Sequence, residues 1–200
     1  MLILPGQLEV RKKGGGRVIR GRFPYMKRAV LTDGGNKGRP VKERFKPGAF
    51  KYRVNDPKAE IHLLVGHDYS QPLASKLTGT MTFEDTFTAL VFEAFILESI
   101  ASTSYGADIL ALIGAGLAVG LSPGFRIPPK QTVPDAETIE DEDPDEGRAI
   151  IRTINDCLLY EMSIVTMPAY ADATVEEVGA VEPEEKRSSL IVPSYRWRHV

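Results

Sequence analysis

Apolar and polar residues alternate along this chain in many short runs, and only one stretch carries a helical period. Alternation over four to eight residues is typical of half-buried β-strands. We therefore expect many short strands with one or two helices, an α+β fold built mainly of antiparallel β-structure, as a barrel or a sandwich. The predicted strand segments are 17–31 (one or two strands), 60–65, 74–81, 88–96, 121–127, 149–153 and 157–167, with the last two forming a hairpin across Asn155 and Asp156.

The helical stretch covers residues 105–119. Ile109, Leu112, Ile113 and Leu117 recur there at the spacing of one helix face. Ser104 is the predicted N-cap, and a glycine at 120 is expected to end the helix before the next strand.

With 200 residues, the chain has room for one domain with a proper core. We expect a folded domain over 17–175, preceded by a flexible segment at 1–16 and followed by a flexible tail at 176–200. Within the domain, residues 131–147 read as a solvated acidic loop, because prolines are followed there by a dense run of Asp and Glu.

Charge is unevenly distributed although the net charge is only −2. Residues 1–60 hold 16 Lys and Arg against 5 Asp and Glu, whereas residues 131–200 hold 6 against 16. The basic residues are scattered through strand-like segments without a reading helix, so specific nucleic-acid binding is not expected. A basic surface that meets an acidic partner, or this chain's own acidic loop, is the better interpretation.

Several classes of protein are not supported by the pattern. The longest apolar stretch, 109–121, is about half a membrane span and is interrupted by glycines, and no secretion leader opens the chain. Cys157 is the only cysteine and lies in an apolar run, where a buried hydrophobe is expected. One cysteine and three dispersed histidines form no ligand cluster, so we expect no metal and no organic cofactor.

Three residues on three strand-like runs carry candidate chemistry: His67, Ser122 and Glu161. A base, a hydroxyl and a carboxylate are what acyl transfer by serine requires. Glu161 is a single acid inside an apolar run, which is costly unless the carboxylate is paired. A surface glutamate on an edge strand stays open as an alternative. Asp68 is a rival acid, although its neighbour position directs it away from His67 and suits a turn cap.

The run Gly120-Leu121-Ser122-Pro123-Gly124 matches the Gly-x-Ser-x-Gly elbow of α/β-hydrolases. That interpretation fails because the elbow needs a strand before the serine and a helix after it, and here the order is reversed. Pro123 also lacks the N–H that the elbow uses for its oxyanion hole. The elbow histidine must follow the acid, which leaves only His199.

Four segments in this order resemble the prohead (capsid maturation) serine proteases of tailed bacteriophages, a family related in fold to the herpesvirus assemblins. The segments are Lys46-Pro47-Gly48-Ala49-Phe50, Leu63-Leu64-Val65-Gly66-His67-Asp68 with Pro72-Leu73, Gly120-Leu121-Ser122-Pro123-Gly124-Phe125, and Tyr160-Glu161-Met162-Ser163-Ile164-Val165 with Pro168-Ala169-Tyr170. The resemblance implies a β-barrel of about seven strands surrounded by helices. It also implies an endopeptidase in which His67 is the general base, Ser122 the nucleophile and Glu161 the third member, where the related viral proteases have a histidine.

The resemblance further implies the biological setting. The substrates would be scaffold segments and extensions of the major capsid protein, together with the chain itself, inside the procapsid in the host cytoplasm; self-association of the chain is left open. Because Pro123 cannot donate a hydrogen bond, the oxyanion donor must come from elsewhere, and the backbone near Ala169 or Tyr170 is the candidate. The alternative function is a catalytically inactive, protease-like assembly or scaffolding protein.

Overall fold

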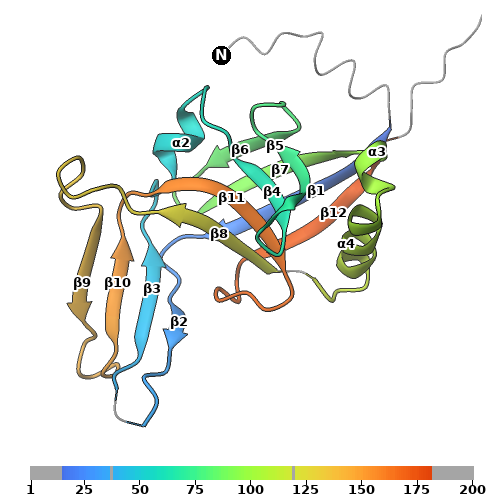
Figure 1. Ribbon diagram of the computed structural model, residues 1–200. Coiled ribbons are helices and arrows are strands. Elements are labelled where there is room, and N and C mark those ends of the chain that lie inside the picture. The colour runs from blue at the N-terminus through green and yellow to red at the C-terminus, as the bar shows by residue number, and fades with distance from the viewer. Residues whose placement is uncertain (1–14, 37, 119, 182–200) are drawn as a thin grey trace, which may run out of the picture.

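Two β-sheets make up most of the molecule, as the computed structural model shows for residues 15–36, 38–118 and 120–181 (Figure 1). A large sheet has the strand order β5-β4-β11-β8-β12-β1-β7-β6, and a small sheet has the order β2-β3-β10-β9. The small sheet extends away from the large one, with β9 at its outer edge (Figure 1).

The elements have the following bounds. The large sheet contains β1 (Gly16–Pro24), β4 (His62–Val65), β5 (Asp68–Ser75), β6 (Met81–Asp85), β7 (Ala89–Leu97), β8 (Gly120–Arg126), β11 (Leu158–Val165) and β12 (Thr174–Val181). The small sheet contains β2 (Ala29–Thr32), β3 (Val41–Phe45), β9 (Glu137–Asp141) and β10 (Ile150–Ile154). The helices are α2 (Lys51–Asn55), α3 (Glu98–Ala101) and α4 (Ser104–Gly114).

Strand β1 shows how the sequence pattern builds the core. Ile19 and Phe23 are fully buried on one face, while Arg20 and Arg22 between them are exposed on the other. This period of two is the strand signature, and β1 pairs in antiparallel fashion with both β7 and β12. The alternation therefore places the apolar core on one face of the large sheet.

An aromatic cluster joins the two sheets. Phe23 of β1 meets Phe45 of β3 edge to face, with ring centroids 5.3 Å apart. Phe45 also packs against Phe125 of β8 at 5.0 Å and against Phe50, just before α2, at 4.9 Å. Aromatic pairs at these separations each add roughly 0.5–1.5 kcal/mol beyond the area they bury. The cluster thereby holds the strand that carries Ser122 against the small sheet.

The predicted barrel is not found. Neither sheet closes on itself, because β5 and β6 remain the two edges of the large sheet. The sheets are also mixed, since β4 pairs with β11 and β3 with β10 in parallel. The three helices formed by the described residues are short and do not surround the strands; α4 packs beside β12 (Figure 1). The mainly-β, α+β class remains the description that fits.

The predicted hairpin over 149–167 is wrong. β10 lies in the small sheet between β3 and β9, whereas β11 lies in the large sheet between β4 and β8. Asn155 and Asp156 carry the chain from one sheet to the other, and both of their N–H groups donate to the carbonyl of Ala136. Local alternation could predict both strands but not their partners.

Two segments expected to be irregular contain strands. β9 lies inside the predicted acidic loop, and β12 occupies the start of the predicted tail, where it pairs with β1. The expected flexible segment 1–16 falls almost entirely on residues outside the described part of the chain, as does the tail beyond Val181. The helix is also shorter than predicted: its N-cap is Thr103, whose hydroxyl accepts from the Gly106 N–H at 3.1 Å.

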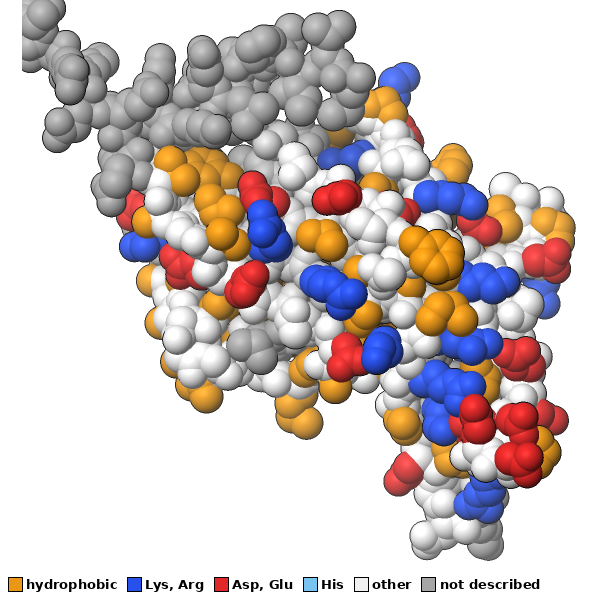
Figure 2. Space-filling view, turned by 180° about the vertical axis from the view of Figure 1, so that it is seen from behind, with side chains coloured by type: hydrophobic (Ala, Val, Ile, Leu, Met, Phe, Trp, Pro, Cys, Tyr) orange, Lys and Arg blue, Asp and Glu red, His pale blue; other side chains and the backbone are white. Residues whose placement is uncertain are grey.

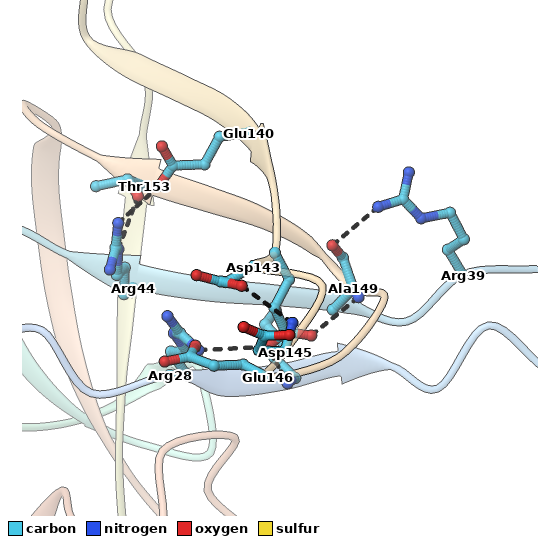
Figure 3. Close-up of polar contacts among 11 residues, drawn as sticks. Arg28, Arg39, Arg44, Glu140, Asp143, Asp145, Glu146, Ala149 and Thr153 are labelled. Atoms are coloured by element: carbon cyan, nitrogen blue, oxygen red, sulfur yellow. Dashed lines mark hydrogen bonds and ion pairs between the residues drawn. The ribbon is translucent and has the colours of Figure 1, made fainter.

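The acidic segment pairs with basic residues of the same chain, which is one of the two alternatives that the charge distribution left open. Arg44 of β3 bonds Glu140 of β9 at 2.7 Å, and Arg28 reaches Glu146 at 2.6 Å (Figure 3). Glu142 is buried between Lys42 and Arg28. Acidic and basic side chains consequently lie next to one another over the small sheet (Figure 2). Among the described residues, no helix is long and apolar enough to cross a bilayer.

Candidate active site

His67 lies at the tip of the hairpin that joins β4 to β5. Val65 pairs with Asp68, so Gly66 and His67 form a two-residue loop. Their φ angles are 57° and 65°, and a type I′ turn requires positive φ at both central residues. The imidazole is therefore presented by a turn, and not by a strand-like run as the sequence predicted.

Asp68 serves the turn and not the imidazole. Its carboxylate accepts from the backbone N–H and the hydroxyl of Ser70, at 2.8 and 2.7 Å, and from Gln71. These hydrogen bonds lower the pKa of Asp68 from its usual value, the Ser70 hydroxyl contributing most. The turn-capping role foreseen for this residue is confirmed, and Asp68 is removed as the rival acid.

Glu161 is the acid that meets His67. It lies on β11, which is flanked by β4 and β8, so the alternative of an edge strand does not apply. Its side chain is 3% exposed, and Oε1 accepts a hydrogen bond from His67 Nδ1 at 2.7 Å. The sequence argument that a carboxylate in an apolar run must be paired is borne out here.

Ser163 completes the surroundings of this carboxylate, although no pattern in the sequence singled it out. Its hydroxyl donates to Glu161 Oε2 at 2.7 Å and accepts from the backbone N–H of His67 at 2.8 Å. Ser163 is fully buried. Its position two residues after Glu161, on the same strand face, was the signal available in the sequence.

Ser122 faces the same site from the neighbouring strand. It pairs with Ser163 across the antiparallel strands β8 and β11, so the two side chains share a face with Glu161. Directly opposed residues have Cβ atoms about 5 Å apart. Ser122 is half-buried, and the His67 side chain is 47% exposed. Among the described residues, no hydrogen bond joins Ser122 to His67, and His67 Nε2 has no protein partner.

The glycines on either side of Ser122 each have a packing reason. A Cβ at Gly120 would lie 2.5 Å from Cγ of Pro168, which follows β11. A Cβ at Gly124 would lie 1.9 Å from Glu161 Oε1, the atom that accepts the hydrogen bond from His67 Nδ1. The Gly-x-Ser-x-Gly pattern therefore arises from two close approaches within a sheet and not from a nucleophile elbow, as the order of elements predicted.

Pro123 lies in the part of β8 that is no longer paired with β12. The Leu121 N–H points away from β11 and donates to the Ala173 carbonyl, and a residue two positions later faces the same side. β12 pairs with β8 at Gly120 alone, so no strand of the described chain pairs with that side beyond it. Proline is tolerated where no ladder partner needs its N–H.

The candidate oxyanion residues lie in the loop between β11 and β12. The Tyr170 ring packs 4.8 Å from Phe23, and its hydroxyl donates to the buried Glu43 at 2.9 Å. Burial raises the pKa of Tyr170 well above its usual range. This side chain therefore anchors the loop. The backbone N–H groups of Ala169 and Tyr170 donate no hydrogen bond within the described residues.

Two other sequence expectations concern groups outside the site. Cys157 is buried, and burial raises the pKa of its thiol, so it remains a protonated core residue. Within residues 15–181, apart from the two undescribed positions, no group of three or more His, Cys, Asp or Glu side chains is arranged to hold a metal ion.

Comparisons with known proteins address the family of the chain. The model of the caudovirus prohead serine protease family matches residues 28–187, four fifths of the sequence. This range includes His67, Ser122, Ser163 and Glu161. No curated protein and no solved structure matches the chain significantly. The family match agrees with the resemblance seen in the sequence segments, and the chain belongs to the caudovirus prohead serine proteases.

Proposed function

We propose that this chain is a serine endopeptidase of prohead maturation, with Ser122 as nucleophile, His67 as general base and Glu161 as the group that orients the base. The observation that carries the proposal is the 2.7 Å hydrogen bond from His67 Nδ1 to the buried Glu161, one strand away from Ser122. This is the base-and-orienter part of a serine protease triad.

The chemistry follows from which imidazole nitrogen is free. Nδ1 carries the proton that Glu161 accepts, so Nε2 holds the lone pair. As Ser122 Oγ attacks the scissile carbonyl carbon, Nε2 takes the hydroxyl proton. It then returns this proton to the leaving amine as the C–N bond breaks, and an acyl-serine ester remains. Nε2 then deprotonates a water that attacks the ester, and it returns this proton to Ser122 Oγ as the new carboxylic acid leaves and Ser122 is regenerated.

The negative charge on the tetrahedral oxygen needs donors that Pro123 cannot supply. The backbone N–H groups of Ala169 and Tyr170 are the proposed donors, because the loop that holds them packs against the strand of Ser122 through the contact of Pro168 with Gly120. Each well-placed donor contributes on the order of 10²–10³ in rate.

The proposed substrates are scaffold segments and extensions of the major capsid protein, and the chain itself, within the procapsid in the host cytoplasm. The uneven charge distribution, for which the sequence left an acidic partner open, has an internal explanation. Arg28, just before β2, and Lys42 and Arg44 of β3 form ion pairs with the acidic segment of the same chain, so these charges require no outside partner (Figure 3).

A comparison of wild type with Ser122→Ala tests the proposal. Both are co-expressed with the capsid protein, and both are treated with a fluorophosphonate probe. We expect the variant to fold, to leave the capsid protein uncut and to take up no probe. Ser102→Ala, at an exposed serine outside the site, should behave as wild type. Undiminished cleavage by Ser122→Ala would refute the proposal, and a folded wild type that takes up no probe would favour the assembly protein.

A further inference from the structure

A closed ring of hydrogen bonds starts and ends at His67. The backbone N–H of His67 donates to Ser163 Oγ, the Ser163 hydroxyl donates to Glu161 Oε2, and Glu161 Oε1 accepts from the imidazole Nδ1. All three distances fall between 2.7 and 2.8 Å. The main chain and the side chain of one residue are thus tied to the same carboxylate.

Each group in the ring can take only one donor or acceptor role. A serine hydroxyl carries one proton, and Ser163 uses it on Glu161, so the oxygen must be the acceptor for the His67 N–H. The two oxygens of Glu161 then serve two different donors. Since Ser163 is fully buried, solvent cannot supply a replacement for either contact.

On this basis, and resting on the function proposed above, we infer that Ser163 is a positioning residue of the protease. Its hydroxyl holds the carboxylate of Glu161 and the backbone of the His67 turn in one arrangement, so that Nδ1 is engaged and Nε2 is directed toward the substrate. Ser163 acts through Glu161 and does not touch the substrate.

The same observations distinguish Ser163 from the nucleophile. Ser163 and Ser122 are opposed across β8 and β11, and either could be taken for the reactive serine from its place in the sheet. Ser163 is fully buried and donates its proton to a carboxylate, whereas Ser122 is half-buried. The fluorophosphonate probe should therefore label Ser122 and leave Ser163 unlabelled.

A double-mutant cycle between Glu161 and Ser163 tests the inference. Ser163→Ala should lower kcat by about 10- to 100-fold with KM unchanged, as expected for lost hydrogen bonds to charged groups. In a Glu161→Ala background the same change should cost clearly less, because only the contact of Ser163 with the His67 N–H remains to be lost. Thr153→Val, at a buried hydroxyl of the small sheet, is the control and should keep wild-type kcat.

A second pair of variants covers a failure of Ser163→Ala to fold. Ser163→Thr and Ser163→Val have nearly the same shape and differ in the hydroxyl, so kcat of the folded Thr variant should exceed that of the Val variant by about 10- to 100-fold. Equal kcat in this pair, or an equal loss from Ser163→Ala with and without Glu161, would overturn the inference. Full activity of Ser122→Ala would instead overturn the proposed function.

Discussion

Ser122 and Ser163 are directly opposed on adjacent antiparallel strands, yet of these two serines only Ser163 is hydrogen-bonded to Glu161 among the described residues. Two identical side chains on one sheet face thereby acquire different chemistry from their burial. Ser163 is enclosed with its proton committed, and Ser122 is accessible with its hydroxyl uncommitted among the described residues. The site can be tested by changes that disturb one of these environments at a time.

Replacing Glu161 by Gln should lower kcat/KM by roughly 10³- to 10⁴-fold, the size of effect seen when a triad acid becomes an amide. If the amide NH₂ faces Nδ1, the imidazole proton moves to Nε2, which can then no longer accept from Ser122. Cleavage of a capsid-derived peptide measures the loss. Glu93→Gln, at an exposed ion pair of β7, is the matched control and should retain activity. Wild-type kinetics for Glu161→Gln would assign the carboxylate a structural role alone.

Gly124→Ala should inactivate the protease while leaving the fold intact. The new Cβ would fall 1.9 Å from Glu161 Oε1, so the flexible carboxylate must leave the position where it receives His67. We expect at least about a tenfold loss of kcat, equivalent to one lost hydrogen bond to a charged group. Gly114→Ala is the control, because a Cβ there meets no atom within 4 Å. A fully active Gly124→Ala variant would contradict the described position of Glu161.

The small sheet should lose stability in acid through Glu142. The hydrogen bond from Lys42, followed by that from the Ala149 N–H, holds the pKa of Glu142 below its usual 4.5. Because its pKa is lower in the folded state, the carboxylate stabilises the fold fully at pH values above its pKa in the unfolded state. This stabilisation is lost as the pH falls through its pKa in the folded state. The free energy of unfolding in urea, measured from pH 7 to pH 3, should therefore converge for wild type and Glu142→Gln.

The matched control for this titration is Glu140→Gln, since Glu140 bonds Arg44 at a largely exposed position. Its difference from wild type should be small throughout, because exposed ion pairs contribute about 0–1 kcal/mol. A Glu142→Gln difference that stays constant over the whole pH range would show that Glu142 does not stabilise the fold through its charge.

Self-cleavage should fall beyond Val181. The sequence predicted a flexible tail from residue 176, but residues 174–181 form β12, whose backbone is paired with β1. Backbone that is paired in a sheet resists proteolysis, so the polar sequence that follows β12 is the expected target. Intact masses of wild type and Ser122→Ala should differ by a C-terminal fragment. Equal masses, or a cut within β12, would argue against this prediction.

The candidate site was largely readable from the sequence because its groups are chemically conspicuous. A histidine beside a glycine and a lone acid in an apolar run stand out, and both were found, with their pairing, in the structure. Ser163 was missed because a serine within a buried strand has no such contrast; its role depends on the turn 96 residues away. The need for a glycine at position 124 could likewise not be predicted from the sequence, since it depends on the Glu161 side chain of another strand.

The fold was readable only in its local elements. Alternation located β1, β2, β4, β7, β8, β10 and β11, but β3 was missed, and the strand predicted over 74–81 is mainly a turn between β5 and β6. Partner choice depends on contacts between distant segments, and so the hairpin over 149–167 and the closed barrel were wrong. β9 was hidden by its acidic composition. Its strand conformation is stabilised by pairing with β10 and by ion pairs such as that of Glu137 with Arg152, which no local pattern contains.

The left-handed backbone of His67 sets chain stability against activity. A non-glycine residue at φ 65° costs of order 1–2 kcal/mol, and selection for a comfortable hairpin tip alone would favour Gly or Asn there. Either replacement would remove the imidazole and leave Oε1 of the buried Glu161 without the hydrogen bond from Nδ1. Under the proposed function, relaxing the backbone at residue 67 and keeping the enzyme active are incompatible goals, so substitutions made for thermostability should exclude this position.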